Sequence, residues 1–134
     1  MEAARTTLTE PVDVVREIFR CFAEGDDPFP LIDENVVWNV PMVEGTYLGH
    51  RGVGEFFRHW IGTWDDYRIT LEQIMPTPDG RVLAMFCEQG SGRGSGVPVH
   101  LHPASVWEVR GGKAISYHGY IDHGDALREV GLGS

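Results

Sequence analysis

The apolar residues of this chain change their spacing about halfway along it, and that change limits the folds that the chain can adopt. In the first half they recur every three or four residues, which places them on one face of a helix. The first stripe comprises Val12, Val15, Phe19 and Phe22, and the second comprises Val53, Phe56, Phe57, Trp60 and Trp64. From residue 67 onward they alternate with polar residues or form short runs, as strands do. The sequence therefore predicts helices first and a β-sheet afterwards.

The shorter segments complete this order. Strands are expected at 36–41, 67–74, 81–89, 97–109 and 114–122, and short helical pieces at 28–35 and 125–132. The run 81–89 is apolar almost throughout, so both faces of that strand should be covered. Glycine and proline mark the turns between the strands. The predicted fold class is α+β, with a curved antiparallel sheet that closes over the N-terminal helices.

Length and composition exclude several classes of protein. The 134 residues fit one domain, 1–134, with residues 1–9 as a flexible tail. The net charge is −9 and Lys113 is the single lysine, so the chain lacks the basic surface that nucleic acid requires. No apolar run approaches the roughly 20 residues of a membrane span. The N-terminus has no apolar signal segment, so we expect a cytoplasmic protein.

A series of short motifs carries a family resemblance. These motifs are "AEGD", "ENVVWNVP", "GTYLGHRGVGEFFRHWIGTWDDY", "GRGSGVPV", "ASVWEVRGGKAISYHGYID" and "DALREVGL", in that order. Together they resemble the SnoaL-like branch of the nuclear-transport-factor-2-like superfamily over almost the whole chain. The resemblance implies a cone-shaped sheet wrapped around a long helix, an internal apolar pocket, and a homodimer formed through the outer face of the sheet.

The resemblance also implies where an isomerase would carry its catalytic groups. The ketosteroid isomerases of this superfamily use a tyrosine and two aspartates, which correspond here to Ile18, Val40 and Ser105. An apolar side chain can neither accept a proton nor donate a hydrogen bond, and serine is only a weak donor. The chain is therefore not expected to isomerise steroids by that mechanism.

We expect the pocket to bind a hydrophobic small molecule. The predicted ligand-binding residues are Trp38, Val40, Phe56, Trp60, Trp64, Ser105, Trp107 and Tyr117. If the chain is an enzyme, the resemblance implies an isomerase, cyclase or dehydratase that needs no cofactor, with Glu88 or Asp122 as the base. Strand alternation leaves open whether Glu88 or Gln89 faces inward, and Asp122 is also a good N-cap for the last helix. The alternative is a binding protein without catalysis.

The motif His100-Leu-His102 has two interpretations. If Ser105 faces the pocket, alternation turns both histidines to the outer face of the sheet. A bulge at Pro103 would reverse that for one of them. Two histidines on one strand can share a metal ion, but a catalytic site needs a third ligand, which this pattern alone does not supply. We therefore expect no metal and no cofactor, and keep metal binding through His100 and His102 as an alternative.

Overall fold

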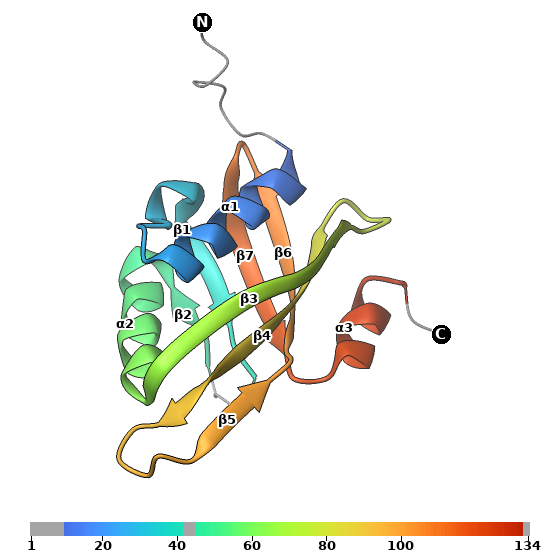
Figure 1. Cartoon of the computed structure of the whole chain (residues 1–134). Helices are drawn as coiled ribbons and strands as arrows, with labels where there is room; N and C mark the ends of the chain where they lie inside the picture. The colour runs from blue at the N-terminus through green and yellow to red at the C-terminus, as the bar shows by residue number, and fades with distance from the viewer. Residues whose placement is uncertain (1–9, 42–44, 133–134) are drawn as a thin grey trace, which may run out of the picture.

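The chain alternates between helices and strands in the order that Figure 1 shows. This computed structural model describes residues 10–41 and 45–132, so the predicted tail at 1–9 lies outside the described residues. The helical elements are α1 (Pro11–Glu24), the single 3-10 turn η2 (Phe29–Leu31), α2 (Gly49–Gly62) and α3 (His123–Glu129). The strands are β1 (Ile32–Asn39), β2 (Tyr47–Leu48), β3 (Trp64–Pro76), β4 (Val82–Gly92), β5 (Pro98–Leu101), β6 (Ala104–Arg110) and β7 (Lys113–Tyr120).

The strands form one curved, mixed sheet that does not close. Their order is β2-β1-β7-β6-β4-β3, and β5 pairs with the far end of β4. All neighbours are antiparallel except β1 and β7, which are parallel. The predicted α+β class is confirmed, with this one parallel pair. No hairpin joins β1 to β7, so no turn geometry forces those two strands to be antiparallel.

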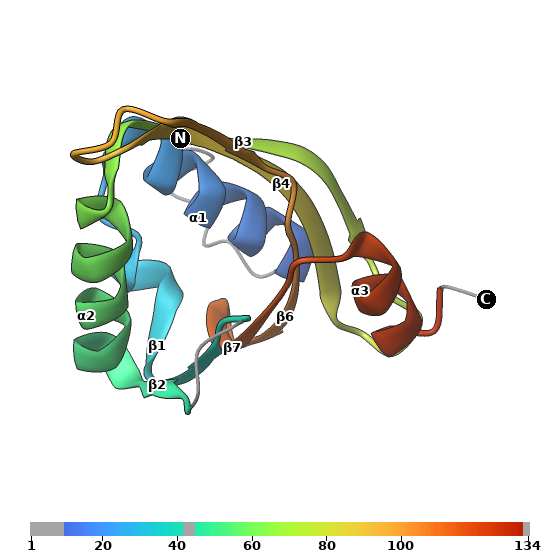
Figure 2. The ribbon, with the colours of Figure 1, turned by 90° about the horizontal axis from the view of Figure 1, so that it is seen from below.

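The sheet wraps around α1, which lies against its concave face (Figure 2). Proline stands in the first turn of this helix, where its missing N–H is not needed. Gly25 ends the helix in the left-handed conformation, with φ of 78°. The helix buries Val14, Val15, Ile18 and Phe19 in the main core. The predicted stripe thus identifies the buried face.

Several predicted boundaries are wrong. β1 begins at Ile32, inside the segment 28–35 that was predicted to be helical, and the helical part of that segment is only the turn η2. Trp64 is the first residue of β3, not the last of α2, because the chain turns at Thr63 while its aromatic side chains continue along the same inner surface. The strand predicted at 97–109 is two strands, β5 and β6, separated by His102 and Pro103. Proline has no N–H to donate to a sheet, and only the carbonyl of Pro103 continues the pairing, accepting from Phe86 N at 3.1 Å.

Strand β4 is covered on both faces, as its apolar run predicts. Residues Val82, Ala84 and Phe86 point to the concave side and join the core around α1. Leu83 and Met85 point to the convex side, where α3 packs on them (Figure 1). The apolar and covered half of β4 ends at residue 87, so Glu88 begins the stretch that carries polar groups.

Candidate functional site

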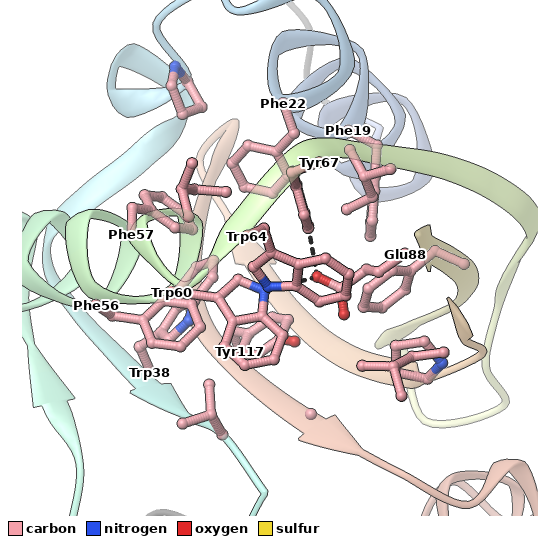
Figure 3. Close-up of a pocket in the computed structure, with 18 of the residues that line it drawn as sticks. Phe19, Phe22, Trp38, Phe56, Phe57, Trp60, Trp64, Tyr67, Glu88 and Tyr117 are labelled. Atoms are coloured by element: carbon pink, nitrogen blue, oxygen red, sulfur yellow. Dashed lines mark hydrogen bonds between the residues drawn. The ribbon is translucent and has the colours of Figure 1, made fainter. Parts of the chain in front are cut away.

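A cavity of about 930 Å³ lies between the concave face of the sheet, α1 and α2 (Figure 3). Its volume falls in the range of about 300–1,000 Å³ that small-molecule sites occupy. Aromatic side chains form a large part of the wall, among them Phe19, Phe22, Trp38, Phe56, Phe57, Trp60, Trp64, Tyr67, Phe86, Trp107 and Tyr117. The rings contact one another, and Trp38 stacks on Tyr117 with ring centroids 4.1 Å apart. Such a surface suits a flat, apolar molecule.

Most of the residues predicted to bind a ligand line this cavity. They are Trp38, Val40, Phe56, Trp60, Trp64, Trp107 and Tyr117. Ser105 does not line it, although it faces the concave side as expected. Its hydroxyl accepts a hydrogen bond from Trp107 Nε1 at 2.8 Å and donates to the carbonyl of Ala84 at 3.4 Å. Ser105 is buried behind the indole, so it orients Trp107 instead of a ligand.

Glu88 is the buried carboxylate of the cavity wall, which Asp26 and Asp66 also line. The pairing of β4 with β3 sets Glu88 opposite Ile69, so Glu88 faces inward and Gln89 faces outward. The side chain is 8% exposed. Its Oε2 accepts two hydrogen bonds, from Tyr67 Oη at 2.5 Å and from Trp60 Nε1 at 2.9 Å (Figure 3). Two donors on different elements therefore fix the carboxylate in one orientation.

Burial and hydrogen bonding act on Glu88 in opposite directions. Removal from water disfavours the charged carboxylate and raises its pKa, whereas the bonds from Tyr67 and Trp60 lower it. Burial is the larger effect, and the pKa of Glu88 is raised overall. Burial also raises the pKa of Tyr67 and of Tyr117, and the nearby charge of Glu88 raises both further, so both phenols stay protonated. A buried carboxyl group whose pKa is raised is a candidate for proton transfer.

Two polar atoms of the wall remain available to a ligand. Among the described residues, neither Glu88 Oε1 nor Tyr117 Oη has a hydrogen-bond partner. Neither is among the completely enclosed unpartnered atoms of the described residues, which are Trp38 Nε1 and His123 Nε2. Glu88 thus offers an acceptor and Tyr117 a donor; other polar residues also line the cavity, namely Asp26, Asp66, Arg93, His102 and Tyr120.

Asp122 lies away from the cavity. It is exposed, and its carboxylate accepts a hydrogen bond from Gly124 N at 2.7 Å at the start of α3. This is the N-cap role expected from the sequence. Asp122 is not among the residues that line the cavity, although the neighbouring Ile121 is, so we assign Asp122 no part in the site.

Sequence reasoning missed Tyr67, the donor nearest to Glu88. The signal was present, because Tyr67 shares the alternation of Ile69 and Leu71 on β3 and so faces inward with them. It also missed Phe86, which lies two residues before Glu88 on the same face of β4. Phe22 and Phe57 were predicted as helix-face residues, but not as part of the cavity wall.

Replacing Tyr67 with phenylalanine is expected to raise the pKa of Glu88 further. The phenol stabilises the charged carboxylate by donating to Oε2, and phenylalanine cannot donate. The side-chain carbon signal of labelled Glu88, followed by NMR against pH, would measure the change. Tyr47→Phe is the control, because Tyr47 does not line the cavity and makes no hydrogen bond to Glu88. A pKa that stays the same or falls in Tyr67→Phe would show that the Tyr67 bond does not stabilise the carboxylate.

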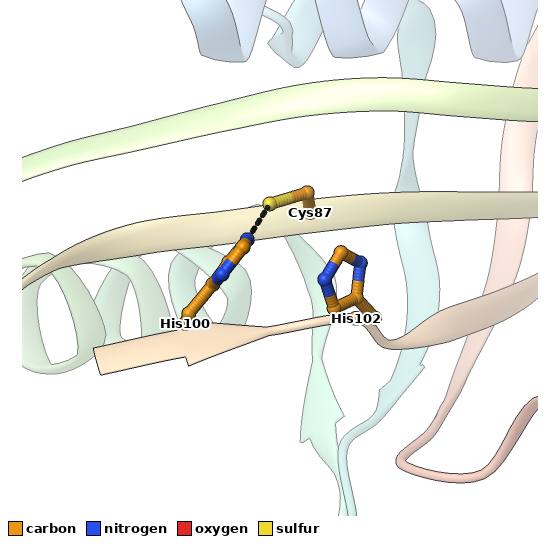
Figure 4. Close-up of side chains that lie close together, drawn as sticks. All are labelled: Cys87, His100 and His102. Atoms are coloured by element: carbon orange, nitrogen blue, oxygen red, sulfur yellow. Dashed lines mark hydrogen bonds between the residues drawn. The ribbon is translucent and has the colours of Figure 1, made fainter.

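The two histidines of the His-x-His motif point to the outer face of the sheet. His100 pairs with Gln89, and Leu101 between the histidines pairs with inward-facing Glu88. His102 follows β5 and also borders the edge of the cavity. The break at Pro103 leaves both imidazoles on the convex side, where His100 Nε2 lies 2.9 Å from the sulfur of Cys87 (Figure 4).

Comparison with known proteins identifies the family. The model of the SnoaL-like domain matches residues 15–117. The chain belongs to the SnoaL-like family. No curated protein sequence matches this SnoaL-like chain significantly.

Solved structures share the fold of this SnoaL-like protein at low sequence identity. An NTF2-like protein of unknown function from Burkholderia pseudomallei K96243 is 21% identical with a TM-score of 0.74, covering 92% of this chain and 98% of its own. TerC, co-crystallised with polyporic acid, is 22% identical with a TM-score of 0.73, covering 91% and 98%. A ketosteroid isomerase-like protein from Catenulispora acidiphila DSM 44928, in complex with trimethylamine, is 15% identical with a TM-score of 0.71, covering 90% and 93%.

The positions that correspond to the ketosteroid isomerase acids carry no acid in this SnoaL-like protein. Ile18 is buried under the sheet, Val40 lines the cavity, and Ser105 is bonded to Trp107. The buried carboxylate of the cavity, Glu88, lies instead on β4.

Two further expectations concern the molecule as a whole. Within the described ranges, no helix has the length and apolar character needed to cross a membrane. The homodimer and the cytoplasmic location stay predictions. Sedimentation equilibrium would check the first, with the expected result of twice the mass of the 15.0 kDa chain.

Proposed function

We propose that this protein binds a flat, hydrophobic small molecule in the cavity and catalyses proton transfer on it, with Glu88 as the base. The observation that carries the proposal is the environment of Glu88. Its carboxylate is buried in an aromatic wall, and both of its donors bind one oxygen, Oε2. The other oxygen is left for a substrate. A buried carboxylate held in this way is suited to accept a proton from carbon.

The substrate class follows from the two available atoms. A carbonyl compound with an acidic C–H group could place that hydrogen at Glu88 Oε1 and its oxygen at Tyr117 Oη. Glu88 would take the proton and become a neutral acid, while the electron pair of the C–H bond moves onto the carbonyl oxygen as an enolate. A hydrogen bond from Tyr117 would stabilise that negative charge. In a β,γ-unsaturated ketone, return of the proton from Glu88 to the γ-carbon completes an isomerisation. In a substrate with a second carbonyl group, attack of the enolate carbon on that group closes a ring, and Glu88 returns the proton to the alkoxide that forms.

This chemistry requires no redox cofactor, because the electrons stay within the substrate. The polyporic acid bound by TerC supports a small organic ligand in a cavity of this fold. That ligand is known only for TerC. The ligand class proposed for this chain rests on the aromatic wall and on the two polar atoms, Glu88 Oε1 and Tyr117 Oη.

Ligand binding can be tested by fluorescence, because all four tryptophans line the cavity. A bicyclic aromatic ketone such as 2-tetralone is expected to quench their emission in a saturable manner. Val40→Phe should weaken binding at least about tenfold, because it fills space that the ligand needs. Val37→Phe is the matched control, since Val37 lies on β1 three residues before Val40, is exposed and does not line the cavity. Equal binding by both variants would place the ligand outside the cavity.

The second candidate is a binding protein without catalysis. It is favoured by the absence of acids at the ketosteroid isomerase positions Ile18, Val40 and Ser105. The two candidates differ in what happens to a bound ketone in heavy water. A proton-transfer enzyme exchanges the acidic C–H hydrogens for deuterium, whereas a binding protein leaves them in place.

A further inference from the structure

A second cluster of reactive side chains lies on the opposite face of the sheet from the cavity. Cys87, His100 and His102 meet on the convex side, with the imidazoles beside the thiol (Figure 4). We infer that these three residues bind a divalent transition-metal ion, and that Zn²⁺ fits them best. Cys87 and Glu88 are neighbours on β4 and point to opposite faces, so this cluster lies across the sheet from Glu88, and only His102 also borders the cavity.

Strand register brings the three residues together. β4 and β5 are antiparallel, with Gln89 opposite His100 and Glu88 opposite Leu101. The same register sets Cys87 opposite His102. Alternate residues on a strand share a face, so Cys87, His100 and His102 all project to the convex side. Cys87 and His100 are distant in the sequence, and the β4–β5 hairpin brings them together by pairing the two strands.

The distances suit a tetrahedral ion. Donor atoms of the three residues all lie within 4.8 Å of one another, and His100 Nε2 is 2.9 Å from Cys87 Sγ. With zinc–sulfur and zinc–nitrogen bonds of about 2.3 and 2.0–2.1 Å, the ligand atoms of a tetrahedral site are about 3.3–3.6 Å apart. The distance from His100 to Cys87 is somewhat shorter than that value, and the other separations do not exceed 4.8 Å. Small rotations of the side chains would complete the geometry, without a change in the backbone.

Glu72 supplies the carboxylate that orients one of the histidines. It lies on β3, and its Oε1 is 3.3 Å from His102 Nδ1. Histidines that bind metals commonly bond a carboxylate through the ring nitrogen that does not face the ion, which fixes the orientation of the ring. Glu72 leaves the other nitrogen of His102 for the metal. The cluster therefore spans β3, β4 and β5, with three ligands and one orienting carboxylate.

The donor set selects for soft and borderline ions. One thiolate and two imidazoles favour Zn²⁺ over Mg²⁺ or Ca²⁺, which prefer oxygen. Burial, together with the charges of Glu72 and Glu88, raises the pKa of Cys87, so the metal-free thiol is protonated. Binding the ion releases that proton to solvent as the Zn–S bond forms. The carboxylate of Glu72, which disfavours a free thiolate, attracts a divalent cation. The fourth position of the ion is left for water.

Metal binding would strengthen the attachment of β5. Among the described strands β5 pairs only with β4, so one of its edges is free. An ion held by Cys87 on β4 and His100 on β5 links the two strands directly. Because the ion binds the folded chain, it is expected to raise the midpoint of thermal unfolding.

The test uses the full chain, stripped with a chelator and titrated with Co²⁺ and then Zn²⁺. Co²⁺ is expected to bind one ion per chain and to show the thiolate-to-cobalt charge-transfer band in the near ultraviolet, and Zn²⁺ should displace it. Cys87→Ser should abolish that band. Cys87→Ser and His100→Gln should each weaken binding at least about a hundredfold, and Glu72→Gln about 10–100-fold.

Controls separate this site from unspecific binding. Cys21→Ser removes the other cysteine and His118→Gln removes an exposed histidine of β7, and both should bind as the wild type does. His100 is exposed, so His100→Gln keeps the proposal testable if Cys87→Ser does not fold. The inference is overturned if Co²⁺ binds without the thiolate band. It is also overturned if His100→Gln binds as tightly as the wild type, or if Zn²⁺ does not bind at all.

Discussion

Replacing Trp107 with alanine is expected to lower the free energy of unfolding by about 3–5 kcal/mol. The indole is completely buried, and its ring centroid lies 5.8 Å from that of Phe19, 5.4 Å from Trp38 and 4.9 Å from Tyr117. Alanine would remove these contacts at the point where α1, β1 and β7 meet β6. It would also leave the hydroxyl of Ser105 without its donor.

Chemical unfolding followed by far-ultraviolet circular dichroism would measure this loss. Trp107→Phe should lose less, because phenylalanine keeps the aromatic contacts and removes only part of the ring and the N–H group. Val97→Ala is the surface control, since Val97 is 56% exposed, and it should change stability by no more than about 0.5 kcal/mol. A loss below about 1 kcal/mol in Trp107→Ala would contradict a packed role for this indole.

The spacing of apolar residues predicted the fold because buried side chains recur every three or four residues in a helix and every second residue in a strand. The stripes that include Phe19 and Phe56 identify the inner faces of α1 and α2, and the run at 81–89 predicts a strand covered on both sides. Boundaries were harder to predict. Trp64 belongs to β3, but its side chain continues the aromatic surface of α2. The sequence pattern shows that these aromatic residues share a surface, and it does not show where the helix ends and the strand begins.

The candidate site was predictable only in part, because it depends on pairing between distant segments. The apolar run of β4 is the same on both faces, so it could not show whether Glu88 or Gln89 points inward. The pairing of Glu88 with Ile69 decides this, and residues far apart in the sequence make that pair. Cys87 and His100 meet for the same reason. The sequence supplied the chemical groups, and the register of the sheet determined which of them meet.

Replacing Glu88 with glutamine is expected to reduce proton transfer by about 10²–10⁴-fold. Glutamine still accepts hydrogen bonds from Tyr67 and Trp60, so the wall of the cavity is kept while the base is lost. The measurement is the rate at which 2-tetralone exchanges its acidic hydrogens in heavy water. Glu55→Gln is the charge-matched control, because Glu55 is exposed on α2. Equal exchange by Glu88→Gln and the wild type would exclude Glu88 as the base.

The same substitution is expected to stabilise the fold at neutral pH. The pKa of Glu88 is raised by burial above the ordinary value of 4.5, so the unfolded chain releases this proton at a lower pH than the folded chain does. At a pH below the ordinary pKa, the carboxyl group is protonated in both the folded and the unfolded state, and its burial does not lower the free energy of unfolding. As the pH rises through the folded-state pKa, the wild type loses stability that Glu88→Gln retains. Unfolding midpoints of the two proteins should therefore agree in acid and diverge toward neutral pH, with glutamine the more stable. A wild type that is more stable than Glu88→Gln at neutral pH would mean that the hydrogen bonds to the carboxylate outweigh its burial, and Glu88 would then be held as a permanent anion that exchanges no proton.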